Sequence, residues 1–472
     1  MPRAASRSGT LPRGSGGRIE MTEQSLSAKG TEAPRRRTIR EAVALYTQRD
    51  VLSVSLLGFS SGLPLALTGG TLSLWMKDVG VTLTAIGLFS LVGLPYTLKF
   101  LWAPVLDAVD VPLLSRLLGR RRGWLLACQI VLIAAIAALA LQDPITAPFG
   151  VAACALAVAI ASATQDIAVD AFRVERLESA SEQAAGMAGY VTGYRIAMLA
   201  TGAGVIALVA YLETALGLPR GTSWFWGYMI AAGCVAIGVI ATLFAREPRA
   251  PVRAPDEGTG HRLVATTVGA FGEFLRRNQA VMILLFVMLF KFCDAFAGVL
   301  TGPFVLDIGF SKATYVEIVK VVGFGGTIAG SFVGAWIARE RPLVTCLWIS
   351  GVLQITSNLG FTLQAYVGPN EAVLTGVILI ENFTSAIGTV IFVAYLSALC
   401  GAREHTATQY ALLTALTAVG RTLLGSSSGA IAEASGWPLF FVLTAVAGLP
   451  GLAALGWLQM KGHFAELARD RA

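Results

Sequence analysis

Twelve helix-length apolar segments follow one another along the chain, and they constrain its fold more than any other feature. Each is close to the ~20 residues that a helix needs to cross the hydrocarbon core of a bilayer. Because lipid offers the backbone no hydrogen-bond partners, such segments must satisfy their own as α-helices. The predicted spans, numbered 1 to 12 in chain order, are 51–76, 81–106, 123–142, 147–171, 186–212, 223–245, 280–306, 313–337, 342–365, 371–400, 406–433 and 437–460.

Composition agrees with a chain that is embedded in a membrane over most of its length. Hydrophobic residues make up 55% of the 472 residues and charged residues 14%, whereas soluble domains are about 25% charged. The sequence therefore indicates an all-α polytopic membrane protein, and not a globular enzyme with one anchor. The net charge of +7 would suggest a nucleic-acid partner in a soluble chain, but here the basic residues follow the membrane topology.

The distribution of lysine and arginine predicts the orientation. Of the 36 such residues, 28 lie in the N-terminal tail, in the connections after even-numbered spans, or after span 12. The connections after odd-numbered spans contain only Lys77, Arg220 and Lys312. Because cytoplasmic loops are enriched in these residues, both termini are predicted to be cytoplasmic.

The longest connection divides the spans six and six, and the halves echo each other. Asp-Val-Gly at 78–80 follows span 1 as Asp-Ile-Gly at 307–309 follows span 7, and Arg195 in span 5 is echoed by Arg421 in span 11. Two six-helix repeats joined by a central loop are the plan of the major facilitator fold. The predicted organisation is a disordered cytoplasmic tail 1–46, an N-terminal bundle 47–245, a cytoplasmic linker 246–279, a C-terminal bundle 280–460 and a cytoplasmic tail 461–472.

Ionisable residues inside the spans are the candidate functional groups, because a charge in hydrocarbon is costly. Asp166 and Asp170 lie one turn apart on one face of span 4, with Arg173 a turn beyond. Asp166 is deeper, where desolvation favours the protonated form of a carboxylate, so it is the first candidate for carrying protons. Asp170 is a further candidate, for which a gate salt bridge is the preferred alternative. The predicted gate residues are Asp107, Arg120, Arg121 and Arg173.

Lys291 and Asp294 lie one turn apart in span 7 and have two interpretations. Either they neutralise each other, or they form a switch in which an anionic solute binds the lysine while a proton binds the aspartate. Arg195 and Arg421 lie near the middle of their spans, where an uncompensated arginine costs about 2.5 kcal/mol or more. Both are therefore predicted to face a wet cavity and to bind an anionic solute or an internal carboxylate.

Further polar residues complete the predicted substrate-binding set. Glu381 and Asn382 in span 10 offer a carboxylate to the arginines or hydrogen bonds to sugar hydroxyls. Lys99 lies nearer the cytoplasmic end of its span, and snorkelling of the side chain to the interface is the alternative explanation both for it and for Lys320 on the outer side. The predicted substrate-binding residues are Lys291, Arg195, Arg421, Tyr194, Glu381, Asn382, Gln165, Gln409 and Lys99.

The sequence gives no support for an enzyme, a cofactor or a metal site. It contains no P-loop, HExxH or GxSxG motif, so neither ATP-driven transport nor common hydrolase chemistry is indicated. The three histidines, His261, His405 and His463, all lie in polar segments, which excludes histidine proton relays from the spans. The six cysteines lie in or beside apolar runs without CxxC spacing and are predicted to be packing residues.

Several long motifs, in order along the chain, resemble the muropeptide permease AmpG family. The similarity covers residues 50 to 460 approximately, and within it the family's aspartate after glutamine matches Asp166, while the glycine that opens GLFSL matches Gly87. The motifs are LGFSSGLPLALTGGTLSLWM (57–76), IGLFSLVGLPYTLKFLWAPVLD (86–107), GRRRGWLLACQI (119–130), ATQDIAVDAFRVE (163–175), KFCDAF (291–296), ENF (381–383) and ATQYALLTALTAVGR (407–421).

The resemblance implies a major facilitator transporter of the bacterial inner membrane, and the chain is predicted to be a monomer. It would import 1,6-anhydro-muropeptides (GlcNAc-anhydroMurNAc and its peptides) from periplasm to cytoplasm by proton symport, for peptidoglycan recycling. The carboxylates and sugar hydroxyls of that solute suit the basic and amide side chains named above. Some family members have two further helices after span 12, so any role of that pair is not expected here.

Three alternatives stay open on the sequence alone. The chain is a facilitator for another anionic solute such as acetyl-CoA, a membrane scaffold or assembly factor that does not transport, or a membrane-embedded transferase. The missing catalytic motifs argue against the transferase. Uptake into vesicles that depends on a proton gradient separates the first class from the other two.

Overall fold

The computed structural model describes residues 46–177, 179–248, 278–399 and 406–469, and within these ranges every regular element is helical. Eleven of the described helices are long and apolar enough to cross a membrane, and they coincide with predicted spans 1 to 10 and span 12. Two consecutive helices, covering residues 406–425 and 428–435, occupy predicted span 11. The predicted N-terminal tail, apart from Tyr46, and most of the predicted linker lie outside the described residues.

Several spans of the N-terminal half are interrupted by short breaks. Span 2 in particular alternates α-helix with 3-10 turns, and span 5 contains a π-helical segment. The elements are α2 (Arg49–Thr68) and α3 (Gly70–Asp78) in span 1; α4 (Leu83–Phe89), η2 (Ser90–Gly93), α5 (Leu94–Leu98) and η3 (Lys99–Leu101) in span 2; α6 (Ala103–Ala108) and α7 (Leu114–Leu118) after it; α8 (Arg120–Ala140) in span 3; α9 (Pro148–Arg176) in span 4; α10 (Ala180–Leu199), η4 (Ala200–Gly204) and α11 (Val205–Thr214) in span 5; and α12 (Arg220–Cys234) and α13 (Ala236–Phe244) in span 6.

The C-terminal half has the same six-span plan. A second π-helical segment occurs here, in span 8. The elements are α15 (Ala280–Leu289), α16 (Phe292–Gly298) and α17 (Thr301–Asp307) in span 7; α18 (Lys312–Thr314), η5 (Tyr315–Val322) and α19 (Gly323–Glu340) in span 8; α20 (Leu343–Val367) in span 9; α21 (Glu371–Leu399) in span 10; α22 (Thr406–Gly425) and α23 (Ser428–Ser435) in span 11; α24 (Trp437–Val446) and α25 (Leu449–Met460) in span 12; and α26 (His463–Arg469) after it.

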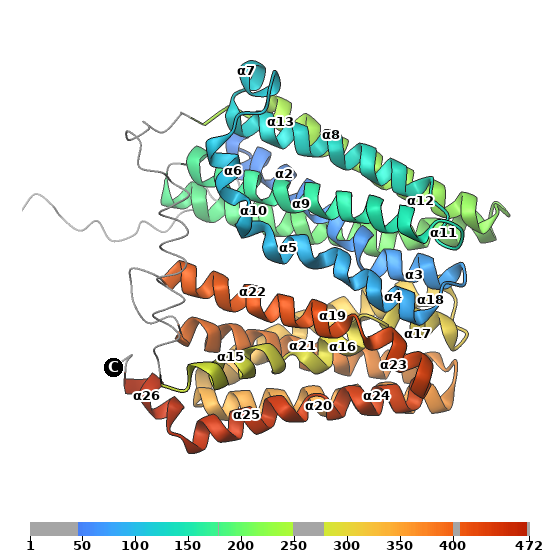
Figure 1. Cartoon of the computed structure of the whole chain (residues 1–472), viewed down its shortest axis with the longest axis vertical. Helices are drawn as coiled ribbons and strands as arrows, with labels where there is room; N and C mark the ends of the chain where they lie inside the picture. The colour runs from blue at the N-terminus through green and yellow to red at the C-terminus, as the bar shows by residue number, and fades with distance from the viewer. Residues whose placement is uncertain (1–45, 178, 249–277, 400–405, 470–472) are drawn as a thin grey trace, which may run out of the picture. The chain divides into compact units, whose positions relative to one another are not determined.

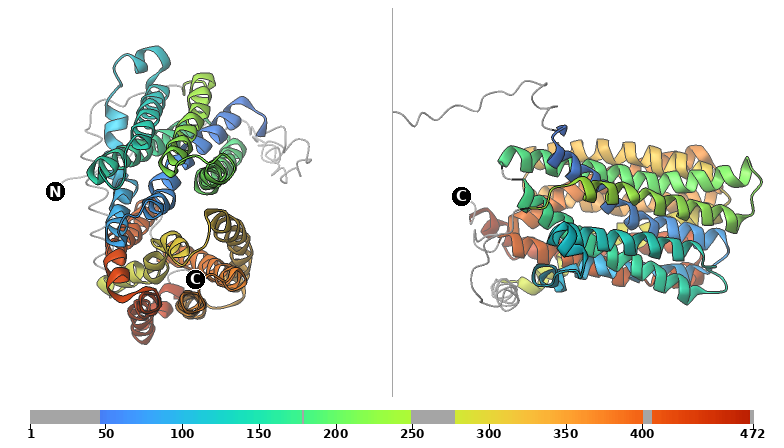
Figure 2. Two further views of the ribbon diagram at one scale, coloured as in Figure 1. Left: turned by 90° about the vertical axis from the view of Figure 1, so that its right-hand side faces the viewer. Right: turned by 90° about the horizontal axis from the view of Figure 1, so that it is seen from above.

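The two halves lie side by side, with their helices running in the same general direction (Figure 1). Figure 2 shows the helices end on, with the blue-to-green half on one side and the yellow-to-red half on the other. Within the interface between the halves, α22 meets η2 and α5, and η4 meets η5. At one end of the protein the halves also touch where α4 meets α23, α3 meets α17 and α11 meets α18. We call this end of the protein, which carries the connections after odd-numbered spans, the outer end, and the opposite end the inner end.

The echoed Asp-x-Gly sequences form matching turns at the outer end. Asp78 and Asp307 are the last residues of α3 and α17. Gly80 and Gly309 follow with φ of 97° and 104°, a left-handed conformation that glycine adopts without a steric penalty. The repeat seen in the sequence is therefore a structural repeat, and it presents one aspartate from each half at the same end of the molecule.

Glycines bring helices into close contact, within a half and between halves. In α19, Gly326, Gly330 and Gly334 pack against α21, and a Cβ added at Gly330 would lie 2.1 Å from the Phe383 carbonyl oxygen. Gly429 in α23 meets the other half, because a Cβ there would lie 1.7 Å from the carbonyl oxygen of Leu83 in α4. The three glycines of α19 thus form a packing surface inside the C-terminal half. Gly429 instead allows the two halves to come into close contact at the outer end.

The segment after span 12 is partly folded. His463 at the start of α26 is buried, and its ring nitrogen lies 3.2 Å from the hydroxyl oxygen of Tyr395 in α21. Phe464 also packs beside the Tyr395 ring. Residues 463–469 therefore cap the inner end of the C-terminal half, a contact that the prediction of a simple tail did not include.

Candidate functional site

A cavity between the two halves contains most of the charged residues that lie inside the spans. Three adjoining compartments of 580, 480 and 410 Å³ form it from the inner end to the outer end. The inner and middle compartments share Tyr96 and Arg421, and the middle and outer compartments share Ser73 and Glu381. Each compartment is within the size range of small-molecule sites, about 300–1,000 Å³.

The inner compartment contains the proposed proton carrier. Asp166 in α9 is only 6% exposed, and its Oδ2 atom lies 3.3 Å from Nζ of Lys99. Lys99 begins the 3-10 segment η3, and Tyr194 of α10 lines the same compartment. The other carboxylate oxygen of Asp166 is buried without a hydrogen-bond partner among the described residues. Asp166 is therefore held by a single cation, and that cation itself faces the cavity.

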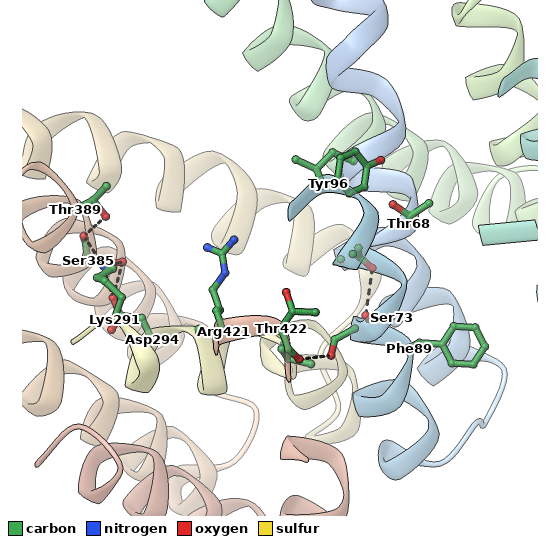
Figure 3. A pocket seen from close by; sticks show the side chains of 18 of the residues that line it. Thr68, Ser73, Phe89, Tyr96, Lys291, Asp294, Ser385, Thr389, Arg421 and Thr422 are labelled. Carbon is green, nitrogen blue, oxygen red and sulfur yellow. Dashed lines mark hydrogen bonds and ion pairs between the residues drawn. The ribbon is translucent and has the colours of Figure 1, made fainter. Parts of the chain in front are cut away.

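The middle compartment contains a closed cluster of polar groups (Figure 3). Nζ of Lys291 lies 2.7 Å from Oδ2 of Asp294 and donates to the Ser385 carbonyl oxygen at 3.1 Å. The Ser385 hydroxyl donates to the same aspartate oxygen at 2.8 Å. α15 ends at Leu289 and α16 begins at Phe292, so the break in span 7 turns Lys291 toward span 10. In this conformation the lysine and the aspartate neutralise each other.

The two mid-span arginines both line the cavity. Arg421 of α22 borders the inner and middle compartments, and Arg195 of α10 borders the outer one. Figure 3 shows Arg421 between the Lys291–Asp294 pair and Tyr96, with its guanidinium pointing into the open space. Neither arginine makes an ion pair with any residue that the structure describes. Both arginines therefore line the cavity without a carboxylate partner in the described part of the chain.

Glu381 and Asn382 lie on the C-terminal side of the outer compartment. Asn382 donates to Oε2 of Glu381 at 2.9 Å and to the Ile378 carbonyl oxygen at 2.9 Å. The Thr327 hydroxyl donates to Oδ1 of Asn382 at 3.3 Å. Glu381 therefore has an amide partner on its own helix and is not paired with an arginine of the described part of the chain.

Other residues predicted for the site lie elsewhere. Gln165 is fully buried and donates to the hydroxyls of Ser60 and Ser61 at 3.2 Å each, so it faces span 1 instead of the cavity. Gln409 lies in α22, but its side chain is outside what the structure describes, as is that of Asp107 in α6.

Two of the predicted gate arginines, Arg121 and Arg173, form ion pairs with residues of the N-terminal half. Arg121 is 5% exposed, and its Nε atom donates to Oε2 of Glu175 at 3.0 Å. Arg173 lies 3.6 Å from Asp170, whose side chain is half exposed. Arg120 is the first residue of α8. The sequence analysis did not single out Glu175, although this residue ends one of the motifs quoted above.

A cluster of ion pairs joins the halves at the outer end, and the sequence analysis did not identify it. On the N-terminal side, Oδ2 of Asp78 accepts from the Trp224 indole at 2.7 Å and lies 2.7 Å from Nζ of Lys312, a residue of the other half. Lys312 also lies 2.6 Å from Oε2 of Glu213. All three ionic side chains are at least three-quarters buried.

The C-terminal half repeats this arrangement. Oδ2 of Asp307 accepts from the Trp437 indole at 2.5 Å, and its other oxygen pairs with Lys77 of the N-terminal half. We call Lys77, Asp78, Glu213, Asp307 and Lys312 together the outer latch. Each latch aspartate is therefore held by a tryptophan of its own half and by a lysine of the other, and the latch closes the cavity at the outer end.

Known proteins are similar to this chain over nearly its whole described length. The sequence profile of the Major Facilitator Superfamily matches residues 54–420. The "Anhydromuropeptide permease" of Escherichia coli (strain K12) is 39% identical over 401 residues, which cover 85% of this chain and 78% of the relative. The "Putative transporter AmpG 4" of Rickettsia felis is 30% identical over 417 residues, covering 88% and 98%.

Solved structures agree on the fold. The nucleoside transporter NupG superimposes with a TM-score of 0.64 at 15% identity, covering 86% of this chain and 98% of that chain. A POT family transporter gives 0.65 at 14% identity, covering 88% and 96%. Together with the relatives, which are permeases and transporters and not enzymes, these findings identify a multi-pass membrane transporter. The chain belongs to the AmpG family of the major facilitator superfamily.

Proposed function

We propose that this transporter imports 1,6-anhydro-muropeptides from the periplasm into the cytoplasm by proton symport, as a monomer in the bacterial inner membrane, for peptidoglycan recycling. The observation that carries the proposal is the cavity, where basic and polar side chains of both halves converge. Arginine forks bind carboxylates bidentately, and the serines and amides of the cavity suit sugar hydroxyls. The 39% identity to an anhydromuropeptide permease supports the same solute.

The charge distribution and the closed end support the orientation of the protein in the membrane and the conformational state of the cavity. The connections at the inner end carry most of the lysines and arginines, which supports a cytoplasmic inner end. The ion pairs that join described residues of the two halves all belong to the outer latch. This conformation is then the inward-facing state, and opening of the latch exposes the cavity to the periplasm.

The Lys99–Asp166 pair supplies a route for proton coupling. When Asp166 takes up a proton, it loses its charge and releases Lys99, which then binds a carboxylate of the solute. Binding of the proton and binding of the anionic solute therefore favour each other, and this coupling is reciprocal. A solute that carries negative charge thus moves together with the proton that freed its binding site.

Uptake of labelled anhydro-muropeptide into right-side-out and inverted vesicles tests the proposal. We expect uptake into right-side-out vesicles, abolished by a protonophore. Asp166→Asn should lose the uptake that the gradient drives, because an amide cannot take up and release the proton that controls the pairing of Lys99. Asp143→Asn, a change of the same kind in the exposed connection after span 3, should behave as wild type.

Two outcomes would contradict the proposal. Normal gradient-driven accumulation by the Asp166→Asn protein would exclude this residue as the proton carrier. No uptake by the wild-type protein in either vesicle orientation, together with a partner that stays bound on purification, would favour the scaffold alternative.

A further inference from the structure

We infer that Lys320 and Arg195 form a second anion-binding subsite at the outer end of the cavity, distinct from the one at Arg421, so that the transporter prefers a solute with two carboxylates over a solute with one. This inference rests on the proposed function and specifies which solutes the site selects.

Lys320 extends across the interface between the halves. It belongs to η5 in span 8, its side chain is half-buried, and it lines the outer compartment together with Arg195. Its ammonium lies within 4 Å of the positions that a Cβ would occupy at Gly70 and Gly202, two glycines of the opposite half. Larger side chains at these glycines would fill the space where the ammonium lies. Lys320 is therefore directed into the cavity and does not extend to the membrane surface.

The two cations lack an ionic partner within the described part of the chain. Neither Lys320 nor Arg195 makes an ion pair with a described residue, and Lys320 instead lies 5.4 Å from the centre of the Tyr315 ring. Glu381 is the carboxylate that lines this compartment among the described residues, and it accepts from Asn382. An amide donor does not neutralise a carboxylate, so the compartment holds two cations from opposite halves and one carboxylate in 410 Å³. The excess of positive charge favours the binding of a further anion.

The backbone around this compartment is irregular on both sides. Arg195 lies one turn before the π-helical segment η4, Lys320 lies within the π-helical segment η5, and these two segments touch. π-helical turns are rare and occur frequently at functional sites. Here two π-helical segments, one from each half, are in contact. They indicate a functional site at this compartment independently of its charges.

The second subsite is separate from the first. Arg421 borders the inner and middle compartments, whereas Lys320 and Arg195 border only the outer one. A solute with one carboxylate can occupy one subsite at a time. A solute with two separated carboxylates can occupy both, and the second contact adds a charge-assisted hydrogen bond to a partly desolvated lysine.

The test compares two labelled solutes in right-side-out vesicles. The disaccharide GlcNAc-anhydroMurNAc carries one carboxylate, and the same disaccharide with an alanyl-glutamate stem carries two. The measured quantity is the ratio of uptake efficiencies, maximal rate divided by KM, of the stem-bearing solute over the stem-free one. In Lys320→Met we expect this ratio to fall about tenfold, as the loss of one charge-assisted hydrogen bond predicts.

Lys461→Met is the matched control. Lys461 is also a lysine over an aromatic ring, 5.8 Å from the centre of Trp457, but it lies after span 12 outside the cavity. The ratio of uptake efficiencies for the two solutes should be the same in Lys461→Met as in the wild type. An unchanged ratio in Lys320→Met, or an equal loss of uptake for both solutes, would overturn the inference while leaving the proposed function standing. Absence of uptake of both solutes by the wild type would instead overturn the proposed function, and the inference with it.

Discussion

Removing Lys312 from the outer latch should open the outer end of the cavity more often. Its side chain is 9% exposed, and its ammonium lies 2.7 Å from Asp78 and 2.6 Å from Glu213. A hydrogen bond to a charged group contributes about 1.5–3 kcal/mol, but burial of the ammonium offsets part of two such bonds. Asp78 also keeps its indole donor when the lysine is lost. We therefore expect Lys312→Met to destabilise the closed state by about 2 kcal/mol, which shifts the equilibrium about thirtyfold.

Thiol labelling measures this shift. Ser73 lines the middle and outer compartments, so a cysteine placed there in a background without native cysteines is reached from the periplasm only when the latch is open. With a membrane-impermeant reagent outside right-side-out vesicles, the labelling rate follows the open fraction as long as that fraction is small. The rate should rise about thirtyfold in Lys312→Met and stay unchanged in Lys461→Met.

A double-mutant cycle identifies which ion pair keeps the outer end closed. If the ion pair holds the latch, Asp78→Asn combined with Lys312→Met should raise the labelling rate by much less than the product of the two single effects. A labelling rate for Lys312→Met equal to that of wild type, or single effects that simply multiply, would refute the assignment of the ion pair as the closing contact.

Two further predictions follow from the packing and from the cavity. Gly429→Val should abolish uptake and raise the rate of the same thiol labelling, because a side chain at this position collides with span 2 when the outer end closes. Gly233→Val is the control: a Cβ there meets nothing within 4 Å, so uptake and labelling rate should both stay unchanged. Lys291→Met should lose uptake, because the substitution leaves the Asp294 carboxylate without its cation. Lys291→Met combined with Asp294→Asn should recover most of the uptake, measured in the same vesicles. A double variant as inactive as the single variant would show that the pair acts as a switch.

The spans and several cavity residues could be predicted from the sequence for the same physical reason. A charge inside a hydrophobic span is too costly to face lipid, which predicts a wet cavity for Arg195 and Arg421 and makes Asp166 and Lys291 candidate functional groups. The structure places each of them on the cavity. Depth along a span could be estimated by counting residues, because the rise per residue of a helix is fixed.

Direction around a helix and partners distant in sequence could not be predicted in this way. Gln165 is next to Asp166, yet successive residues of a helix point about 100° apart, and the glutamine turns to span 1 while the aspartate turns to the cavity. Arg121 pairs with Glu175, 54 residues away, and no local pattern specifies that choice. For Lys320 the sequence left snorkelling as an explanation, because the two glycines that make room for its ammonium lie in the other half.

The outer latch explains the exceptions to the charge rule that oriented the chain. The connections after odd-numbered spans contain three basic residues, Lys77, Arg220 and Lys312. Two of them form the ion pairs between the halves, and Arg220 donates to the Asp78 carbonyl oxygen at 2.7 Å. An ionic contact suits reversible closing of the outer end, because the cost of desolvating the charges offsets much of their attraction. Alternating access requires that the closed and open states differ by only a few kcal/mol, and a latch of partly buried ion pairs holds one alignment of the halves without making its opening too slow. A purely apolar surface of the same extent would bind the halves without that offset. Two of the three basic residues that depart from the topology rule, Lys77 and Lys312, are thus the ones that join the halves in the latch.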